Sequence, residues 1–407
     1  MNKSKSEKLW TKDFTLIWQG QLISTLGDAI YSVALGFWVL QVTGSTALMG
    51  TLMAVSALPG ILISPFAGVW IDRINKKILL ISMDILRGVG MVLIAIAAFS
   101  HVIAVWMVFA AGILLSVCGA VFRPGVNSSI PAMVPGFRLS NAISIQSAAS
   151  TGSNMLGNVA GGFLYQLFGA PLLFLFNGLS YFFSGVSLCF TKIPKSQHNS
   201  QPDFRRDMRD GFHYMWKQKG LRYLLLIAAI TNFFSYVAIV LFLPLFQQTP
   251  TLGAGRYGIA MACFMGGAMV GFLLFSAVTI PPQKRAILII SSNGISDICF
   301  VLAINQQLFS IMIPLIILGG LSNSVVNVIL QSAIQATTPN EVRGKVLAFM
   351  NMTTQSLTPF AMALGGVLAS ILPIRIIIAA SFLINLLIVT PFAFVKTFIR
   401  FIGYDEK

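Results

Sequence analysis

Charged side chains are scarce in this 407-residue chain: Asp, Glu, Lys and Arg together supply 10% of it, against about 25% in soluble domains. Histidine and cysteine are also rare, with 3 and 4 copies, and neither recurs at metal-ligand spacing. The phosphate-binding pattern Gly-x-x-x-x-Gly-Lys-Ser/Thr is missing. These absences exclude an ordinary soluble domain and argue against a metal site, an enzyme and a nucleotide-driven pump. We therefore expect neither catalysis nor a cofactor.

Apolar residues dominate instead, at 56% of the chain with a mean hydropathy of +0.83. A helix that crosses a bilayer needs about 20 mainly apolar residues. Twelve runs of this kind span 14–40, 47–70, 78–99, 103–122, 142–168, 171–191, 223–246, 257–280, 286–304, 309–333, 346–372 and 376–395. They lack the in/out alternation of barrel strands and are longer than such strands. We therefore predict an all-α integral membrane protein with twelve transmembrane helices.

The basic residues are distributed unevenly, although 27 Lys and Arg against 12 Asp and Glu could suggest a nucleic-acid ligand. Apart from Arg87, Arg256 and Arg375, they lie in the two tails and in every second loop between the runs. Lys and Arg are enriched in cytoplasmic loops, so this pattern predicts that both termini lie in the cytoplasm. The excess charge then faces anionic lipids, and we expect no nucleic-acid partner.

One long hydrophilic stretch divides the chain into two halves of six runs each. Pro135 and Arg138 precede the fifth run, and Pro339 and Arg343 precede the eleventh, about half a chain later, as a duplicated six-helix unit would leave. We therefore predict two six-helix bundles. The predicted parts are a cytoplasmic tail 1–13, a bundle 14–191, a linker 192–222 with an amphipathic surface helix at 207–217, a bundle 223–395 and a cytoplasmic tail 396–407.

The first run carries polar residues on one helical face, at Gln21, Thr25, Asp28 and Ser32. A carboxylate at mid-membrane costs about 2.5 to 3.5 kcal/mol on insertion scales, and desolvation favours the neutral form of a carboxyl group. Asp28 is therefore our candidate proton carrier. Two other interpretations stay open: a structural Asp bonded to Thr25 or Ser32, and an anion that binds cationic substrates.

Two other runs contain charges. Asp84 and Arg87 are three residues apart and can pair on one face of the third run, so we favour a structural ion pair over a transport role. Asp297 in the ninth run has no basic neighbour in sequence, and we favour a structural or gating role for it.

Amide side chains form stripes at fourfold spacing in the fifth run, with Asn154 and Asn158, and in the tenth, with Asn323, Asn327 and Gln331. Such stripes line a water-filled cavity or join helices by hydrogen bonds, and small residues beside them let two backbones approach closely.

The loop after the second run reads Gly68-x-x-x-Asp72-Arg73-x-Asn75-Lys76-Lys77. It resembles the loop signature of the major facilitator superfamily, Gly-x-x-x-Asp-Arg-x-Gly-Arg/Lys-Arg/Lys. The match departs at Asn75, where the family usually has Gly. We expect a left-handed backbone there, which Asn tolerates next best.

Further motifs resemble the drug:proton antiporter branch of that superfamily, which includes bacterial macrolide efflux proteins. Gly157-Asn158-Val159-Ala160-Gly161-Gly162 is similar to the antiporter motif Gly-Pro-x-x-Gly-Gly, with Asn158 in place of Pro, and we assign it to helix packing. Asp28, the Pro-x-Glu-x-Arg-Gly-Lys-Val string at 339–346 and the Asp-x-x-x-Gly-Phe string at 207–212 also fit this branch.

The resemblance implies a central cavity lined by runs 1, 4, 7 and 10. The residues it places there are Gln21, Thr25, Tyr31, Asn232, Phe233, Tyr236, Asn323, Asn327 and Gln331. It also implies a cytoplasmic gate, in which Asp72 caps a helix of the second half when the inside is closed. The predicted gate residues are Gly68, Asp72, Arg73, Lys76, Lys77, Arg138, Glu341 and Arg343.

Together these patterns predict a monomeric secondary transporter that exports hydrophobic or amphipathic compounds in exchange for protons by alternating access. The proton gradient would supply the energy. The alternatives are an exporter of a siderophore, lipid or peptide, a proton-coupled importer and, from another class, a membrane sensor or scaffold that does not transport.

Overall fold

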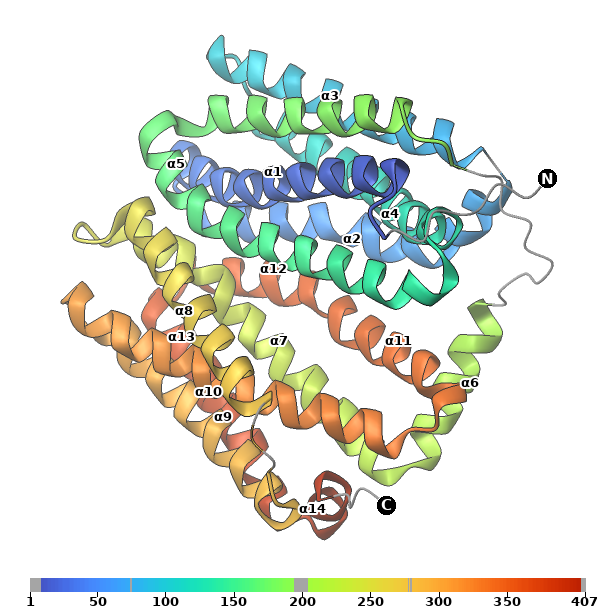
Figure 1. Cartoon of the computed structure of the whole chain (residues 1–407). Coiled ribbons are helices and arrows are strands. Elements are labelled where there is room, and N and C mark those ends of the chain that lie inside the picture. The colour runs from blue at the N-terminus through green and yellow to red at the C-terminus, as the bar shows by residue number, and fades with distance from the viewer. Residues whose placement is uncertain (1–8, 74, 194–203, 277, 279, 404–407) are drawn as a thin grey trace, which may run out of the picture. The chain divides into compact units, whose positions relative to one another are not determined.

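A computed structural model describes residues 9–73, 75–193, 204–276, 278 and 280–403, and nearly all of them are helical (Figure 1). The side chains described exclude those of 64–70, 72, 73, 204–208, 276, 340 and 341. The chain divides into two compact units. Unit 1 comprises Met1–Gly44 and Leu52–Gln201, and unit 2 comprises Ser45–Thr51 and Pro202–Lys407. Residues 45–51 and the amphipathic helix belong to unit 2.

Unit 1 contains the first five helices and a short 3-10 helix. Their bounds are α1 Lys12–Thr43, α2 Thr46–Arg73, α3 Lys76–Phe99, α4 Val105–Met133, η1 Gly136–Arg138 and α5 Leu139–Cys189, with the start of α2 in unit 2.

Unit 2 contains the remaining elements. Their bounds are α6 Phe204–Lys217, α7 Lys219–Gln248, α8 Gly253–Ser276, α9 Pro282–Asn305, α10 Phe309–Thr337, α11 Asn340–Ser356, α12 Thr358–Leu368, α13 Ile374–Val389, η2 Thr390–Phe394 and α14 Lys396–Ile402.

Within the described residues, ten helices are long and apolar enough to cross a membrane, whereas the hydropathy pattern predicts twelve crossings. Two features of the backbone account for the difference. The 51 residues of α5 would measure about 75 Å at 1.5 Å per residue, more than twice a ~30 Å hydrocarbon core. This helix breaks at Gly169 (φ 71°, ψ 177°), between predicted runs five and six. The eleventh run is divided at Leu357 into α11 and α12, which are each too short to count alone.

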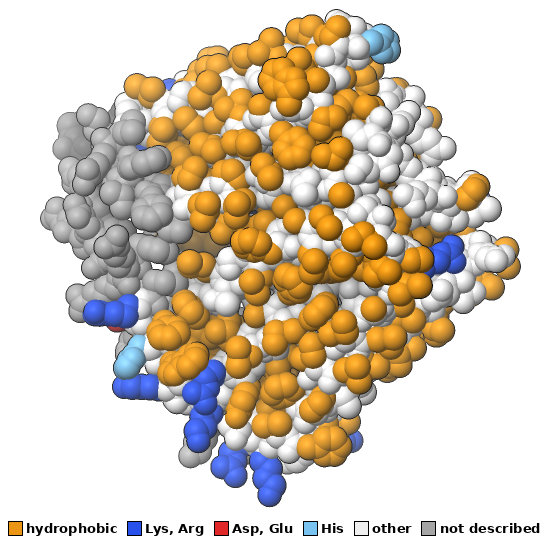
Figure 2. Space-filling view, turned by 180° about the vertical axis from the view of Figure 1, so that it is seen from behind, with side chains coloured by type: hydrophobic (Ala, Val, Ile, Leu, Met, Phe, Trp, Pro, Cys, Tyr) orange, Lys and Arg blue, Asp and Glu red, His pale blue; other side chains and the backbone are white. Residues whose placement is uncertain are grey.

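Large apolar side chains cover the outside of the molecule (Figure 2). Examples are Leu93 on α3, Leu273 on α8 and Leu387 on α13, which are 60%, 64% and 71% exposed. A soluble monomer rarely exposes apolar patches of this extent. The chain is therefore a multi-pass membrane protein.

In unit 1, α1 lies between the two arms of α5 (Figure 1). Its start is capped by Thr11, whose hydroxyl accepts from the backbone N–H of Phe14, and its end by Gly44 at φ 63°. A Cβ atom on Gly157, in the first arm of α5, would lie 2.5 Å from the Cβ of Ala29, so this position needs glycine. The close approach fixes α1 along its length.

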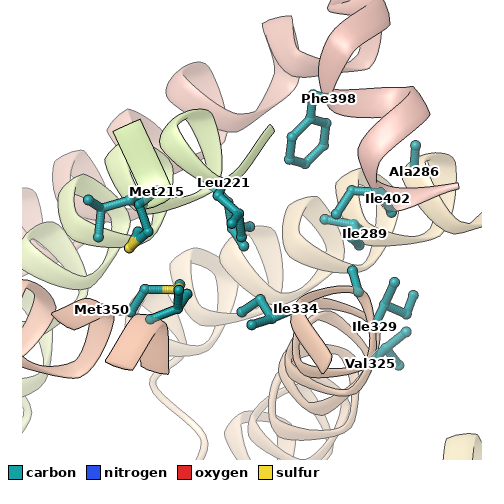
Figure 3. Close-up of a cluster of buried hydrophobic side chains, with 14 residues drawn as sticks. Met215, Leu221, Ala286, Ile289, Val325, Ile329, Ile334, Met350, Phe398 and Ile402 are labelled. Carbon is teal, nitrogen blue, oxygen red and sulfur yellow. The ribbon is translucent and has the colours of Figure 1, made fainter. Parts of the chain in front are cut away.

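In unit 2, buried apolar side chains from α6, α7, α9, α10, α11 and α14 form one cluster (Figure 3). Met215 of α6 and Met350 of α11 lie at one end of it, and Phe398 and Ile402 of α14 at the other. The amphipathic helix α6 is thus anchored by its apolar side to the membrane-spanning helices.

Asn75 does not adopt the left-handed backbone expected of it, because its φ is −62°. It is instead the N-cap of α3, and its side-chain oxygen accepts from the backbone N–H of Lys77 at 3.1 Å. An N-cap needs extended backbone and a short polar side chain, so Asn serves here for a different reason than the one predicted.

Replacing Gly169 by Ala should destabilise the protein by about 1 to 3 kcal/mol, because a side chain there is strained at positive φ. Thermal unfolding of the purified protein measures the effect. Gly152→Ala in the same helix is the control, because a Cβ there meets no atom within 4 Å. Equal unfolding temperatures for the two variants would contradict the strain.

Candidate functional site

Asp28 lies at the middle of α1, beside the glycine that brings the second arm of α5 against it. A Cβ atom on Gly27 would lie 2.7 Å from both the side-chain oxygen of Asn177 and the hydroxyl of Ser180. About two turns earlier, a Cβ on Gly20 would lie 3.1 Å from the hydroxyl of Ser184. Two glycines on one face of α1 therefore place the polar residues of α5 next to Asp28.

Tyr181 of α5 is the hydrogen-bond partner of Asp28. Its phenol O–H donates to Asp28 Oδ1, and the Tyr181 side chain is 1% exposed. Asp28 itself is half-buried and is therefore the more accessible member of the pair. The bond is neither of the local contacts, with Thr25 or Ser32, that spacing on α1 suggests.

Asp84 and Arg87 form a buried ion pair on α3, with Arg87 donating from Nη2 to Asp84 Oδ1. Their side chains are 0% and 5% exposed. The guanidinium carbon of Arg87 lies 4.3 Å from the ring centres of Tyr181 and of Phe122 on α4. Cation–π contacts of this kind gain strength where water is excluded.

Tyr181 thus joins two charged groups from different helices. Its hydroxyl binds Asp28 of α1, and its ring contacts the Arg87 guanidinium, which is paired with Asp84. The result is a continuous network across α1, α5 and α3, within unit 1. Sequence reasoning identified Asp28, Asp84 and Arg87 separately and missed Tyr181, because no local spacing connects a residue of α5 to α1.

The network contains two carboxyl groups and one guanidinium. If all three are ionised, one negative charge is left over in a region shielded from water, which is unfavourable. Asp84 contacts Arg87 directly, whereas Asp28 contacts a neutral phenol. The Arg87 guanidinium is therefore paired with Asp84 and not with Asp28.

The other predicted cavity residues of unit 1 differ in exposure. Gln21 and Thr25 are half-buried on α1. Tyr31 is 6% exposed, and its ring packs edge-on against Phe174 of α5 at 5.5 Å. Among the described residues, its hydroxyl has no hydrogen-bond partner. Tyr31 therefore belongs to the packing between α1 and α5 as well as to the surroundings of Asp28.

In unit 2, the predicted cavity residues fall into two groups. On α7, Asn232 donates to the carbonyl of Thr354 on α11 at 3.2 Å, Phe233 packs edge-on against Phe234, and Tyr236 is half-buried. On α10, Asn327 donates to the side-chain oxygen of Asn323 at 3.1 Å, and Gln331 is exposed. The amides of Asn323 and Asn327 are therefore neighbours on one face of α10. Asn232 is hydrogen-bonded to α11 instead.

The glycine motif of α5 lies against α1. Gly157 meets Ala29, and a Cβ on Gly161 would lie 2.9 Å from the Cβ of Val33. Gly162 is buried. The amide of Asn158 donates to the carbonyl of Asn154 in its own helix at 2.8 Å, and does not bridge to α1.

Part of the predicted gate lies outside the side chains that the structure describes, namely Gly68, Asp72, Arg73 and Glu341. Of the remainder, Lys76 is buried, and Lys77 Nζ donates to the carbonyl of Cys189 at 2.6 Å. The Arg138 guanidinium lies 5.5 Å from the Phe137 ring, and Arg343 Nη2 donates to the carbonyl of Thr338 at 3.1 Å.

Asp297 of α9 is a second buried carboxyl group, in unit 2. It is 6% exposed and accepts a hydrogen bond of 2.8 Å from the amide of Asn293, one turn earlier. The neighbouring Ser296 donates to the carbonyl of Gly319 on α10. The Ser296 bond attaches α9 to α10, whereas the Asn293–Asp297 bond lies within α9.

Comparisons with known proteins cover nearly the whole chain. The family model described as Major Facilitator Superfamily matches residues 17–361. Macrolide efflux protein A of Streptococcus pyogenes is 26% identical over 386 residues, 92% of this chain and 93% of that protein. Multidrug efflux pump Tap of Mycobacterium bovis is 22% identical over 364 residues, 86% of this chain and 85% of that one. A solved bacterial homologue of the human lysosomal transporter Spinster, inward-facing and unoccupied, is 15% identical with a TM-score of 0.70, covering 97% of this chain and 99% of its own.

Arg87→Met should destabilise the protein by about 3 to 5 kcal/mol, because it leaves the Asp84 carboxylate buried without its cation. Adding Asp84→Asn should recover most of the loss. Thermal unfolding in detergent measures both, with the exposed Arg123→Met on α4 as the control. A single variant as stable as the control would disprove the dependence of Asp84 on Arg87.

Proposed function

The chain belongs to the Major Facilitator Superfamily, and from this membership we propose that it exports hydrophobic or amphipathic compounds in exchange for protons. It is a membrane transporter of small molecules, as its family and its relatives indicate. Two relatives are named for macrolide and multidrug efflux, which favours export of drug-like compounds. The observation that carries the proton half of the proposal is the hydrogen bond between Tyr181 and Asp28, beside the Asp84–Arg87 pair.

Asp28 is the proton site in this mechanism. With Asp28 ionised, the network of unit 1 carries a surplus negative charge, and α1 has to keep the carboxylate beside polar partners or water. With Asp28 protonated, the charge is balanced and α1 can move through a drier environment. A conformational change that exposes Asp28 to one side and then to the other therefore moves a proton across the membrane.

Each unit has polar side chains suited to a large, weakly charged substrate. In unit 1 they are Gln21 and Thr25 on α1, and in unit 2 they are Asn232 on α7 and Asn323 and Asn327 on α10. Amides and hydroxyls bind polar groups without requiring a charge. Phe233 and Tyr236 add apolar contact area on α7.

The setting that fits this activity is a bacterial plasma membrane, with both termini in the cytoplasm and the protein acting as a monomer. The distribution of Lys and Arg supports this orientation. The proton gradient is the energy source, and no cofactor takes part in the proposed cycle.

Replacing Asp28 by Asn tests the proton site. The amide keeps the size of the side chain and cannot exchange a proton, so efflux driven by an imposed pH gradient should stop in proteoliposomes. Asp13→Asn at the start of the same helix is the control and should transport normally. The assay uses a panel of macrolides, other antibiotics and dyes.

Two outcomes would refute the proposal. Undiminished gradient-driven efflux by Asp28→Asn would remove Asp28 from the mechanism. Absence of gradient-driven flux of every compound with the unaltered protein would refute drug:proton exchange itself and favour an importer or another substrate class.

Tyr181→Phe examines the hydrogen bond separately. Phe keeps the ring against Arg87 and removes only the donor to Asp28. A hydrogen bond to a charged group contributes about 1.5 to 3 kcal/mol, so the coupled flux should fall about tenfold or more and its pH dependence should change. Tyr257→Phe, a buried tyrosine of unit 2, is the matched control. A pH profile identical to that of the control would show that the bond has no role in coupling.

A further inference from the structure

The amphipathic helix α6 is fixed to α11 by three kinds of contact. Lys345 Nζ forms a salt bridge of 2.8 Å with Asp210 Oδ2. A Cβ atom on Gly211 would lie 2.7 Å from the carbonyl oxygen of Lys345, so the two backbones touch. Met215 is 2% exposed within the cluster of Figure 3. This side of α6 is fully used in packing.

Two aromatic rings of α6 are partly exposed to the surroundings. One of them, Phe212, also packs against Phe349 of α11, with 5.6 Å between the ring centres. Phe212 and Trp216 are 43% and 54% exposed, and their rings stack at 5.4 Å. The Arg222 guanidinium, one turn into α7, lies 5.3 Å from the Trp216 ring centre. The pair stands at the end of α6 that leads into α7, a helix long and apolar enough to cross the membrane.

Four cations flank this aromatic pair in the sequence. Arg209, Lys217 and Lys219 are exposed, and Arg222 is half-buried. Between residues 209 and 222 the one acidic residue is Asp210, whose carboxylate is bound to Lys345. Figure 2 shows Lys and Arg side chains gathered along the lower margin of the molecule, with apolar surface above them.

We propose that this surface, formed by Arg209, Phe212, Trp216, Lys217, Lys219 and Arg222, binds the headgroups of anionic phospholipids. Exposed Phe and Trp insert at the boundary between headgroups and acyl chains. Lys and Arg beside them bind the phosphate groups. An acidic soluble protein would satisfy the cations, but a membrane surface satisfies the cations and the aromatic pair together, at the point where the chain enters the bilayer.

Headgroup binding has a consequence for α11. Because α6 is joined to α11 through Asp210–Lys345 and the Gly211 contact, lipid bound on the outer side of α6 holds the start of α11 in place. The lipid composition of that leaflet is thereby linked to a helix of unit 2. This inference does not require Asp28 to carry a proton.

The test measures how much lipid stabilises the delipidated protein in detergent. Phosphatidylglycerol should raise its unfolding temperature by several degrees more than phosphatidylcholine does. Lys217→Gln/Lys219→Gln/Arg222→Gln should lose most of this difference, and Trp216→Ser should reduce it. The control Lys12→Gln/Arg123→Gln/Lys192→Gln removes three exposed cations of unit 1 and should keep it.

The proposal is overturned if the α6–α7 variant gains as much stability from phosphatidylglycerol as the control variant does. It is also overturned if glycerol phosphate or heparin stabilises the protein as much as the lipid, since that would indicate a binding site for soluble anions. Unfolding temperatures in phosphatidylcholine alone show whether each variant is folded before the comparison is made.

Discussion

The cost of charge away from water is the constraint on which unit 1 depends. Asp84 and Arg87 are almost fully buried, so each requires the other. The Arg87 guanidinium carbon also lies 4.3 Å from the ring centres of Phe122 and Tyr181, which limits where the side chain can move. Once Arg87 is fixed, Tyr181 is fixed, and its hydroxyl is directed at Asp28. One buried cation therefore determines the surroundings of a carboxyl group on a different helix.

Close helix packing is what brings these groups together. Gly27 of α1 allows the second arm of α5 to approach, and Gly157 and Gly161 allow the first arm, to which they belong, to lie against α1. Gly169 allows the chain to pass from one arm to the other. In hydrocarbon, the association of helices relies on such close contacts. An apolar side chain gains little by moving from lipid to the surface of another helix, because both surroundings are apolar. The same small residues thus serve the fold and the site.

Much of this architecture could be predicted from the sequence, and the reason is locality. Apolar runs and the i, i+3 spacing of Asp84 and Arg87 are local patterns, and the glycine motif was visible as a string. Tyr181 was not predictable, because it meets Asp28 across 153 residues. Asn75 was wrongly expected to be left-handed because the family's glycine suggested it, whereas Asn can also cap a helix with its side chain.

The difference in exposure between the two carboxyl groups separates their roles. Asp84 is completely buried and paired, so losing its charge would leave Arg87 without an anion. Asp28 is half-buried and accepts its hydrogen bond from a neutral phenol, so the proposed protonation of Asp28 would leave the Asp84–Arg87 pair intact. Tyr181 contacts both groups, and it is the residue through which the ion pair and the proposed proton site are joined.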